Sequence, residues 1–390
     1  METLYKSFTN IYKSPSIQII MKKEANVSPW DVSGKVDYNK LSKQFGTKEI
    51  SQKILENLMN THPILWRGNY FAHRDFDLWI KDAEAGKKVS ILTGRGPSEK
   101  MHLGHLVPFL AAKALQDKYD CNVYIPISED EKFFVKKDLS LKDSEKFAEE
   151  NILDIIALGF KPSKTFIMRD FSYPELYKQA SQIAKLITYS EAKSVFGLKP
   201  GNNIGWTFYP AVQAAHILLP QFIEGKHRTL VPVGIDQDPF IRLTRDVAEH
   251  PTLKFTKPSA IHSKFIPSLK GSVKMSSSEG AETNLIYLSD SEKEVKKKIN
   301  KYAFSGGKDT LEEHRKHGGN SSIDISFQYL KMLFEKSDKT LKEIEENYKS
   351  GKLLSGELKQ ILIKKINSFL KEHQEKRKSA KKQLKKFMID

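Results

Sequence analysis

The chain has 390 residues, 64 of them basic and 48 acidic, and carries a formal net charge of +16 at pH 7. This length predicts two or three domains, and no apolar run approaches the roughly 18 residues that a membrane-spanning helix needs. A single cysteine, Cys121, rules out a disulfide framework and a cysteine-rich metal site, predicts no metal centre of that kind, and fits a cytoplasmic location.

The excess of basic residues favours a polyanionic partner, either a nucleic acid or an anionic membrane surface. No amphipathic anchor accompanies it, so we interpret the charge as nucleic-acid binding and expect no membrane partner. A lysine-rich proteome is the alternative source of the same charge. Residues 1–23 are basic and nearly free of acids, which leaves open a targeting leader or a later start at Met21.

Residues 1–66 are predicted to form a mixed N-terminal segment with a short helix over Ser51–Asn60. From about residue 67, β-like runs alternate with amphipathic helical runs. The predicted strands are Val89–Thr93, Asn122–Ser128, Thr165–Arg169, Thr229–Ile235 and Ser259–Ile266, and the predicted helices are Leu106–Lys118, Asp143–Leu158, Pro174–Thr188 and Pro239–Glu249. This alternation predicts an α/β fold built from βαβ units around a parallel sheet.

After about Asn284 the pattern becomes lysine-rich and helical, and it ends in the long stretch Glu357–Met388. Apolar residues recur there at spacings of three and four: Leu358, Ile361, Leu362, Ile366, Phe369 and Leu370. Such spacing places them on one face of a helix. We therefore predict a helical C-terminal domain over residues 284–390 with a basic outer face.

A segment rich in glycine and histidine joins the first predicted strand to the helix that follows it. It comprises Thr93, Gly94, Arg95, Gly96, Pro97 and Ser98, then Met101, His102, Leu103, Gly104 and His105. A turn from strand to helix leaves backbone N–H groups free for a phosphate, and glycine lets the backbone approach a nucleotide. Neutral histidine side chains also donate hydrogen bonds to phosphate oxygens. The alternative is a helix start that carries two histidines by coincidence.

A second segment places a lysine among small hydroxyl residues: Lys274, Met275, Ser276, Ser277 and Ser278. An ammonium group on a loop suits a triphosphate, because it neutralises charge that develops on the α-phosphate and on the leaving pyrophosphate. Alone, such a loop is more often simply solvated. The predicted βαβ region lies between the two segments, and the pair together indicates a nucleotide site.

These two segments resemble the HIGH and KMSKS signatures of class I aminoacyl-tRNA synthetases. Further similarity to tryptophanyl-tRNA synthetases of the archaeal and eukaryotic type covers about Pro29 to Phe387, in five motifs: Pro29–Val32, Ser128–Lys132, Gly234–Pro239, Ala303–Asp309 and Ser355–Lys359. The resemblance implies a Rossmann-type catalytic domain with an insertion over residues 67–283 and an anticodon-binding domain over residues 284–390. It also implies ATP and Mg²⁺, the substrates tryptophan and tRNA(Trp), and a homodimer.

The resemblance assigns roles to individual residues. It implies catalytic roles for His102, His105, Lys274, Ser276 and Ser278, ATP contacts for Gly94, Gly96, Lys132, Trp30 and Met275, amino-acid contacts for Glu131, Gln237 and Gln213, and tRNA contacts for Asp37, Lys308 and Asp309. Carboxylate and amide oxygens both accept hydrogen bonds from an ammonium group, which agrees with Glu131 and Gln237 binding the α-ammonium. Core packing for Trp30 and plain surface exposure for Lys308 are the alternatives.

The side-chain pocket departs from the pattern of the family. Leu92 stands where the family usually has tyrosine, Pro126 where it has Gln or Glu, and His216 where it commonly has proline. The two missing side chains normally accept the indole N–H. Two interpretations follow: either His216 has become the new acceptor, or the chain binds ATP and tRNA but has lost or changed its amino acid, with tyrosine as one candidate.

Overall fold

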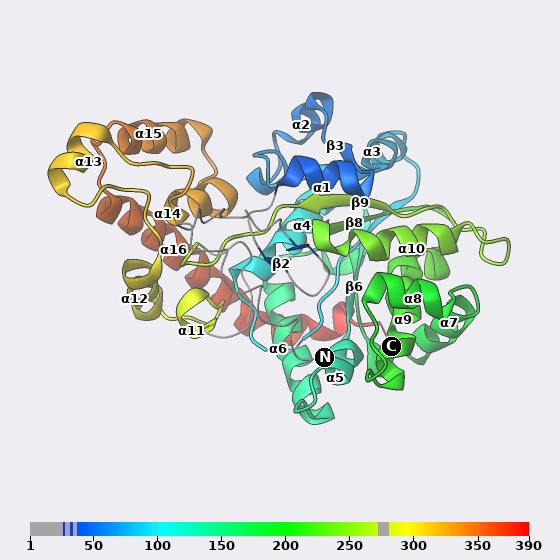
Figure 1. Ribbon diagram of the computed structural model, residues 1–390. Helices are drawn as coiled ribbons and strands as arrows, with labels where there is room; N and C mark the ends of the chain where they lie inside the picture. The colour runs from blue at the N-terminus through cyan, green and yellow to red at the C-terminus, as the bar shows by residue number, and fades with distance from the viewer. Residues whose placement is uncertain (1–25, 28–31, 34–36, 98, 272–280, 390) are drawn as a thin grey trace, which may run out of the picture.

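The computed structural model describes residues 26–27, 32–33, 37–97, 99–271 and 281–389 of the chain (Figure 1). A seven-stranded sheet forms its centre, in the order β3-β4-β9-β8-β5-β6-β7. The strands are β3 Lys48–Glu49, β4 Tyr70–Arg74, β5 Val89–Leu92, β6 Asn122–Ile127, β7 Thr165–Arg169, β8 Arg228–Gly234 and β9 Ser259–Ser263. The five strands from β9 to β7 are parallel, and β3 and β4 add an antiparallel edge.

The five parallel strands follow the order of a doubly wound, Rossmann-type sheet. β5 pairs with β6 on one side and with β8 on the other, so successive connections leave β5 in opposite directions. A crevice forms at the carboxyl ends of the strands where the order reverses, and ligands bind there in open α/β sheets. The topology therefore points to the ends of β5 and β8 as the place of a site.

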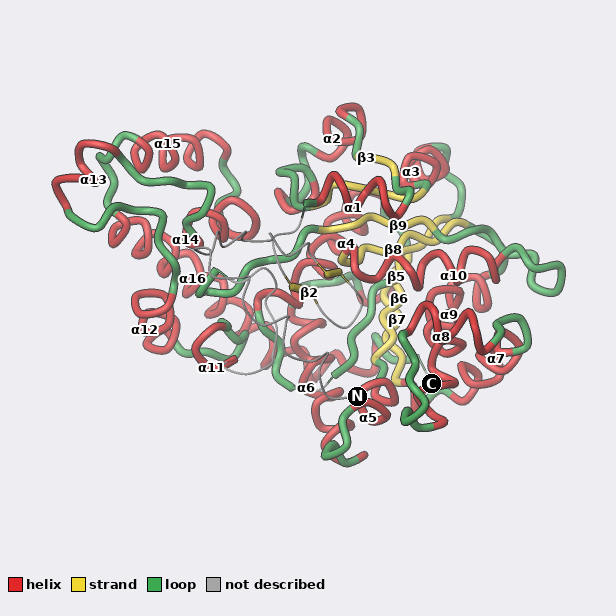
Figure 2. Tube along the Cα trace, viewed as in Figure 1, coloured by secondary structure: helices red, strands yellow, loops and turns green. Residues whose placement is uncertain are grey.

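Sixteen α-helices are described around the sheet (Figure 2). They are α1 Tyr38–Phe45, α2 Gln52–Leu58, α3 Phe76–Glu84, α4 Leu106–Tyr119, α5 Glu129–Val135, α6 Leu141–Ala157, α7 Pro174–Ala184, α8 Tyr189–Phe196, α9 Ile204–Glu224, α10 Asp238–Ala248, α11 Ala281–Asn284, α12 Glu292–Tyr302, α13 Leu311–His317, α14 Ile325–Tyr329, α15 Asp338–Lys349 and α16 Ser355–Gln383. A two-stranded ribbon, β1 Asn26–Val27 with β2 Val32–Ser33, is described separately from the main sheet.

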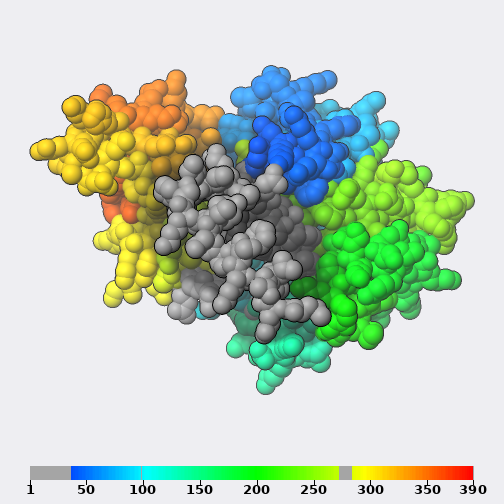
Figure 3. Space-filling model, in the orientation of Figure 1, coloured from blue at the N-terminus to red at the C-terminus, as the bar shows by residue number. Residues whose placement is uncertain are grey.

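Alternate residues of the parallel strands face two different apolar cores. Ile91 and Val123 belong to the core that contains α3, α4, α6 and α16, whereas their neighbours Leu92 and Tyr124 belong to the core that contains α7 to α10. This division follows from the two-residue period of a strand, and strands buried on both faces are typical of parallel sheets. Figure 3 shows α7–α10 (green) at one end of the molecule and α12–α15 (yellow to orange) at the other.

The C-terminal helix joins the two ends of the molecule. α16 packs against α12 and α14 near its start and runs on against α6 beside the sheet. Beyond it the chain pairs with the outer strand of the sheet: Ile167 N–H donates to Phe387 O at 2.7 Å, and Ile389 N–H donates to Ile167 O at 2.9 Å. Residues 387–389 thus cover the free edge of β7. The domain boundaries at residues 66/67 and 283/284 remain predictions.

All five predicted strands are confirmed to within a few residues at each end, as are the four helices predicted between them and the final helix. The helix α9 was not predicted, and it contains Pro210 and Pro220. Within the described ranges, none of the helices combines the length and the apolar character that crossing a bilayer requires.

Candidate active site

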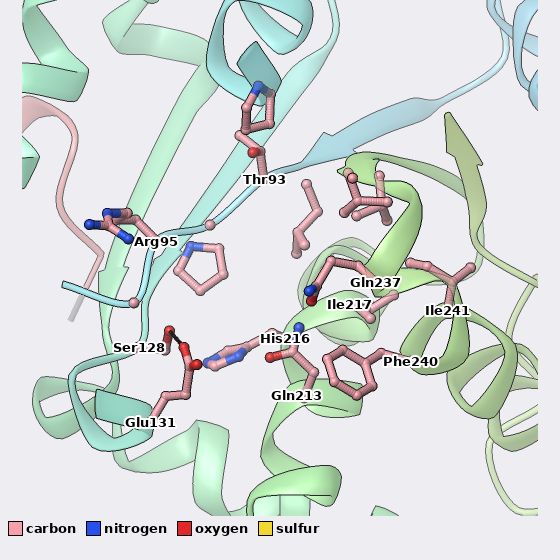
Figure 4. A pocket seen from close by; sticks show the side chains of 18 of the residues that line it. Thr93, Arg95, Ser128, Glu131, Gln213, His216, Ile217, Gln237, Phe240 and Ile241 are labelled. Carbon is pink, nitrogen blue, oxygen red and sulfur yellow. Dashed lines mark hydrogen bonds between the residues drawn. The ribbon is translucent and has the colours of Figure 1, made fainter. Parts of the chain in front are cut away.

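A cavity of about 450 Å³ opens at the carboxyl ends of β5 and β8, where the strand order reverses (Figure 4). Its polar walls are formed by Thr93, Arg95, Ser128, Glu131, Lys132, Tyr209, Gln213, His216 and Gln237. Its apolar walls include Leu92, Pro126, Ile217, Val231, Val233, Phe240 and Ile241. Glu131 lies at one end of the cavity and Phe240 and Ile241 at the other, which suits a ligand with one charged end and one apolar end (Figure 4).

The loop after β5 approaches the neighbouring segments so closely that two positions have no room for a side chain. A Cβ atom at Gly94 would lie 2.9 Å from the backbone oxygen of Pro126. At Gly96 it would overlap the carboxylate of Glu131 and lie 2.7 Å from Cε of Lys132. Gly94 therefore lets the loop run beside β6, and Gly96 leaves space for the two charged side chains of α5.

His102 and His105 stack on each other at the start of the following helix, with ring centroids 3.5 Å apart. Nδ1 of His102 accepts from Gly104 N–H at 3.1 Å, and Nδ1 of His105 accepts from His102 N–H at 3.2 Å. In a neutral ring the proton then resides on Nε2, so both histidines present an Nε2–H donor. Burial lowers the pKa of His102 to about 3, which keeps its ring neutral. Neither histidine is among the described residues that line the cavity.

The segment after residue 280 is bonded to the histidine turn, and the segment before residue 272 is bonded to that following segment. Leu269 N–H donates to Asn284 O at 3.0 Å, which brings the two sides of the segment together. Leu103 N–H, between the two histidines, donates to Ile286 O at 3.0 Å. The base of the predicted lysine loop is thus attached to the predicted phosphate turn. The predicted residues Lys274, Met275, Ser276, Ser278 and Trp30 lie outside the described residues.

Two charged side chains of α5 reach the cavity together. Lys132 Nζ lies 2.6 Å from Glu131 Oε1, and Ser128 Oγ donates a longer hydrogen bond of 3.4 Å to Glu131 Oε2. Both charged side chains are partly buried. The pair offers a carboxylate to a cationic group and an ammonium to an anionic group, as a zwitterionic amino acid requires.

α9 presents Tyr209, Gln213 and His216 to the cavity, because residues three and four apart share one face of a helix. Figure 4 shows Gln213 and His216 on this helix. The hydroxyl of Tyr209 donates to Gln213 Oε1 at 2.8 Å. Gln237 enters from the turn Ile235–Gln237 after β8, where its Nε2 donates to Asp236 at 3.2 Å. The structure therefore gathers all the predicted amino-acid contacts in one cavity.

Two of the three departures from the family pattern, Leu92 and Pro126, form part of the apolar wall. Leu92 is buried and has no polar side-chain atom. The backbone oxygen of Pro126, its only acceptor, already accepts from Arg95 N–H at 3.0 Å. Leu92 therefore offers no acceptor to an N–H group of a ligand, and the only acceptor of Pro126 already has one donor.

Behind the cavity wall lie two buried carboxyl groups that the sequence analysis missed. Asp170, from the turn that follows β7, contacts His216 Nε2 through Oδ1 at 2.9 Å. Asp130, at the start of α5, accepts from the hydroxyl of Tyr177 at 3.2 Å and lies close to Asp170. These residues are far apart in the sequence, and no spacing rule brings them together.

The predicted tRNA contacts lie away from the cavity. Asp37 is exposed and caps α1, where its carboxylate accepts from Asn39 N–H and Lys40 N–H at 3.0 Å each. Lys308 and Asp309 are exposed in the loop between α12 and α13.

The sequence family described as tRNA synthetases class I (W and Y) matches residues 84–371, which include the whole cavity. The chain belongs to this family. Among its relatives, the tryptophan–tRNA ligase of Sulfurisphaera tokodaii is 50% identical over 95% of this chain and 97% of its own length. That of Saccharolobus solfataricus is 49% identical, with the same coverage of both chains.

Solved class I synthetase structures share the fold. The tryptophanyl-tRNA synthetase of Plasmodium falciparum superposes with a TM-score of 0.83 at 41% identity, covering 90% of this chain and 97% of that one. The enzyme from Encephalitozoon cuniculi, solved bound to tryptophan, gives a TM-score of 0.82 at 36% identity, covering 91% and 98% of the two chains.

Proposed function

We propose that this chain is a tryptophan–tRNA ligase, which activates tryptophan with ATP and transfers it to tRNA(Trp). The observation that carries the proposal is the arrangement at the strand switch point. There, a cavity with a charged end and an apolar end lies beside a histidine turn that is bonded to Ile286, in the segment that follows the lysine-bearing residues. The family membership and the identity to tryptophan–tRNA ligases support the same reaction.

In the first step, the amino-acid carboxylate attacks the α-phosphate of ATP, which gives an aminoacyl-adenylate and pyrophosphate. The Nε2–H groups of His102 and His105 are suited to donate to phosphate oxygens, and the fixed tautomers hold these donors in place before ATP binds. We assign Lys274, Ser276 and Ser278 to the same phosphates. Mg²⁺ is expected to arrive bound to the triphosphate and to neutralise part of its charge.

The amino acid binds with its charged end at α5. Glu131 accepts from the α-ammonium, together with Gln213 and Gln237, while Lys132 neutralises the carboxylate or the adjoining α-phosphate. The side chain then extends toward Phe240 and the apolar wall. No covalent protein nucleophile is needed, since catalysis consists of positioning and charge stabilisation.

In the second step the tRNA 3′ end accepts the aminoacyl group. The net charge of +16 favours binding of the phosphate backbone, independent of its sequence. We assign Lys308 and Asp309 to the anticodon, and Asp37 to the acceptor end. Because Lys308 and Asp309 are exposed, both are accessible to a nucleic acid.

We also propose a homodimer in the cytoplasm. Three apolar side chains are exposed around α5 and the start of α9: Val135 at 45%, Phe171 at 37% and Ile204 at 84%. Phe171 packs against Phe133, and the residue before Ile204, Asn203, donates to Phe134 O, which joins these positions into one region. An exposed apolar region of this kind is typical of an interface between subunits.

ATP–pyrophosphate exchange, measured with each of the twenty amino acids, tests the reaction. Exchange with tryptophan alone is expected. Exchange with none of the twenty would favour a paralogue that binds ATP and tRNA without activating an amino acid, and exchange with tyrosine would indicate a changed specificity.

A further inference from the structure

A buried row of polar side chains runs from Tyr177 through Asp130 and Asp170 to the cavity wall at His216. The Asp170–His216 contact is 2.9 Å, and both side chains are at most 3% exposed. The carboxyl groups of Asp130 and Asp170 lie close enough to shift each other's pKa. Oδ2 of Asp170 is buried without a hydrogen-bond partner among the described residues.

Two adjacent buried carboxyl groups do not both ionise, because like charges repel strongly where water is excluded. Burial and the neighbouring Asp170 raise the pKa of Asp130 to about 9, and burial also raises the pKa of Asp170. One proton therefore stays with the pair near neutral pH. With this proton on Asp130, its carboxyl donates to Oδ2 of Asp170 and completes the bonding of that atom.

His216 is neutral in this arrangement, because burial lowers its pKa to about 4. With the shared proton on Asp130, Asp170 is a carboxylate, and Nε2 of His216 is then the nitrogen that donates to it. Nδ1 then carries the lone pair. No described residue bonds to Nδ1 of His216, and this atom keeps some exposure to solvent.

Three other acceptors at the cavity already have a partner or an assigned role. The oxygen of Pro126 accepts from Arg95 N–H, and Gln213 and Gln237 are assigned to the α-ammonium. His216 Nδ1 has no partner among the described residues, and a neutral ring nitrogen suits a ligand group that donates one hydrogen bond.

We propose that Asp130 and Asp170 share one proton and, through Asp170, hold His216 in the tautomer whose Nδ1 accepts the indole N–H of tryptophan. The inference rests on the proposed function, since it concerns how that amino acid is selected. His216 touches the substrate in this scheme, whereas Asp130 and Asp170 are positioning residues.

The test compares tryptophan with β-(3-benzothienyl)alanine, which has sulfur in place of the indole N–H. In ATP–pyrophosphate exchange we expect wild-type kcat/KM to favour tryptophan at least about tenfold, because the analogue leaves the buried acceptor unpaired. His216→Phe keeps a ring but removes the acceptor, and we expect it to bring the ratio of the two substrates close to one. Glu131→Gln serves as the control: it contacts the group common to both substrates, so it should lower both activities and preserve the ratio.

The positioning residues are tested with the same ratio. Asp130→Asn keeps a donor toward Asp170 and is expected to retain the preference for tryptophan. Asp170→Ala releases Nε2 and is expected to reduce the preference severalfold in protein whose thermal unfolding shows that it is folded. If Asp170→Ala does not fold, the substrate ratio of His216→Phe still tests whether His216 accepts the indole N–H.

The two possible failures are distinguishable. A wild-type chain that shows no exchange with tryptophan contradicts the proposed function itself. A wild-type chain that exchanges tryptophan and the analogue equally well, or a His216→Phe variant that keeps the wild-type ratio, overturns the assignment of His216 and leaves the proposed function standing.

Discussion

Gly96→Ala should damage activity while leaving the fold intact. The added Cβ would overlap the Glu131 carboxylate and lie 2.7 Å from Lys132 Cε, both of them far ends of flexible side chains. These ends swing away at little cost in folding, but Glu131 then leaves the position from which it would bind the α-ammonium. Loss of a charge-assisted hydrogen bond costs about 1.5–3 kcal/mol, so we expect kcat/KM for tryptophan to fall roughly 10- to 150-fold.

Gly94→Ala is the matched comparison. Its Cβ would lie 2.9 Å from the backbone oxygen of Pro126, so strand β6 itself would have to shift. Overpacking against a backbone costs about 1–3 kcal/mol. We therefore expect a lower unfolding midpoint for Gly94→Ala and an unchanged or slightly higher one for Gly96→Ala, since alanine restricts the unfolded chain.

Pyrophosphate exchange at varied tryptophan concentration gives kcat/KM, and urea unfolding gives the free energy of unfolding. The reasoning is refuted if Gly96→Ala keeps wild-type kcat/KM, or if it loses as much stability as Gly94→Ala. Either result would mean that the position of the Glu131 carboxylate does not depend on the absence of a side chain at Gly96.

Three other predictions follow from the structure. Although burial opposes it, the ion pair with Arg74 holds the pKa of Asp238 at about 2, below its usual 3.8. This ion pair should therefore stabilise the fold by about 2 kcal/mol above pH 4, and the stabilisation should be lost as the pH falls toward 2. A difference in urea midpoint between wild type and Asp238→Asn that is the same at pH 7 and at pH 3 would contradict this. Phe387→Ala should lower the free energy of unfolding by about 3–5 kcal/mol, because the ring is 1% exposed, and a calorimetric loss below about 1 kcal/mol would speak against its packing role. Lys308→Ala should weaken tRNA binding and reduce the slope of log K against log salt by about one, as measured in a salt titration. Lys185 is also exposed, and Lys185→Ala should leave the affinity and the slope unchanged. Equal effects of the two substitutions would contradict a contact between Lys308 and tRNA.

The parallel sheet was predictable from the sequence because its strands are short apolar runs separated by amphipathic helices, and both patterns are local. α9 was not, because Pro210 normally signals the end of a helix and Pro220 repeats the signal. In the structure α9 continues through both positions, and its buried apolar face packs on the sheet. Tertiary packing thus outweighed the local preference.

In the site, too, local features could be predicted from the sequence and contacts made by tertiary packing could not. The histidine turn could be predicted because its residues are neighbours along the chain. His216 was singled out by its departure from the family pattern, but its partner Asp170 was not, since the two meet only after β7 and α9 have packed together. Spacing in sequence carries no information about such a contact.

The pairing of residues 387–389 with β7 has a consequence for biosynthesis. β7 ends at Arg169, and the residues that cover its edge leave the ribosome more than two hundred positions later. At typical elongation rates of about 5–20 residues per second, the outer strand of the nascent catalytic domain stays uncovered for roughly ten to forty seconds. An uncovered strand edge invites pairing with other chains, so the newly made protein is most exposed to aggregation during this interval.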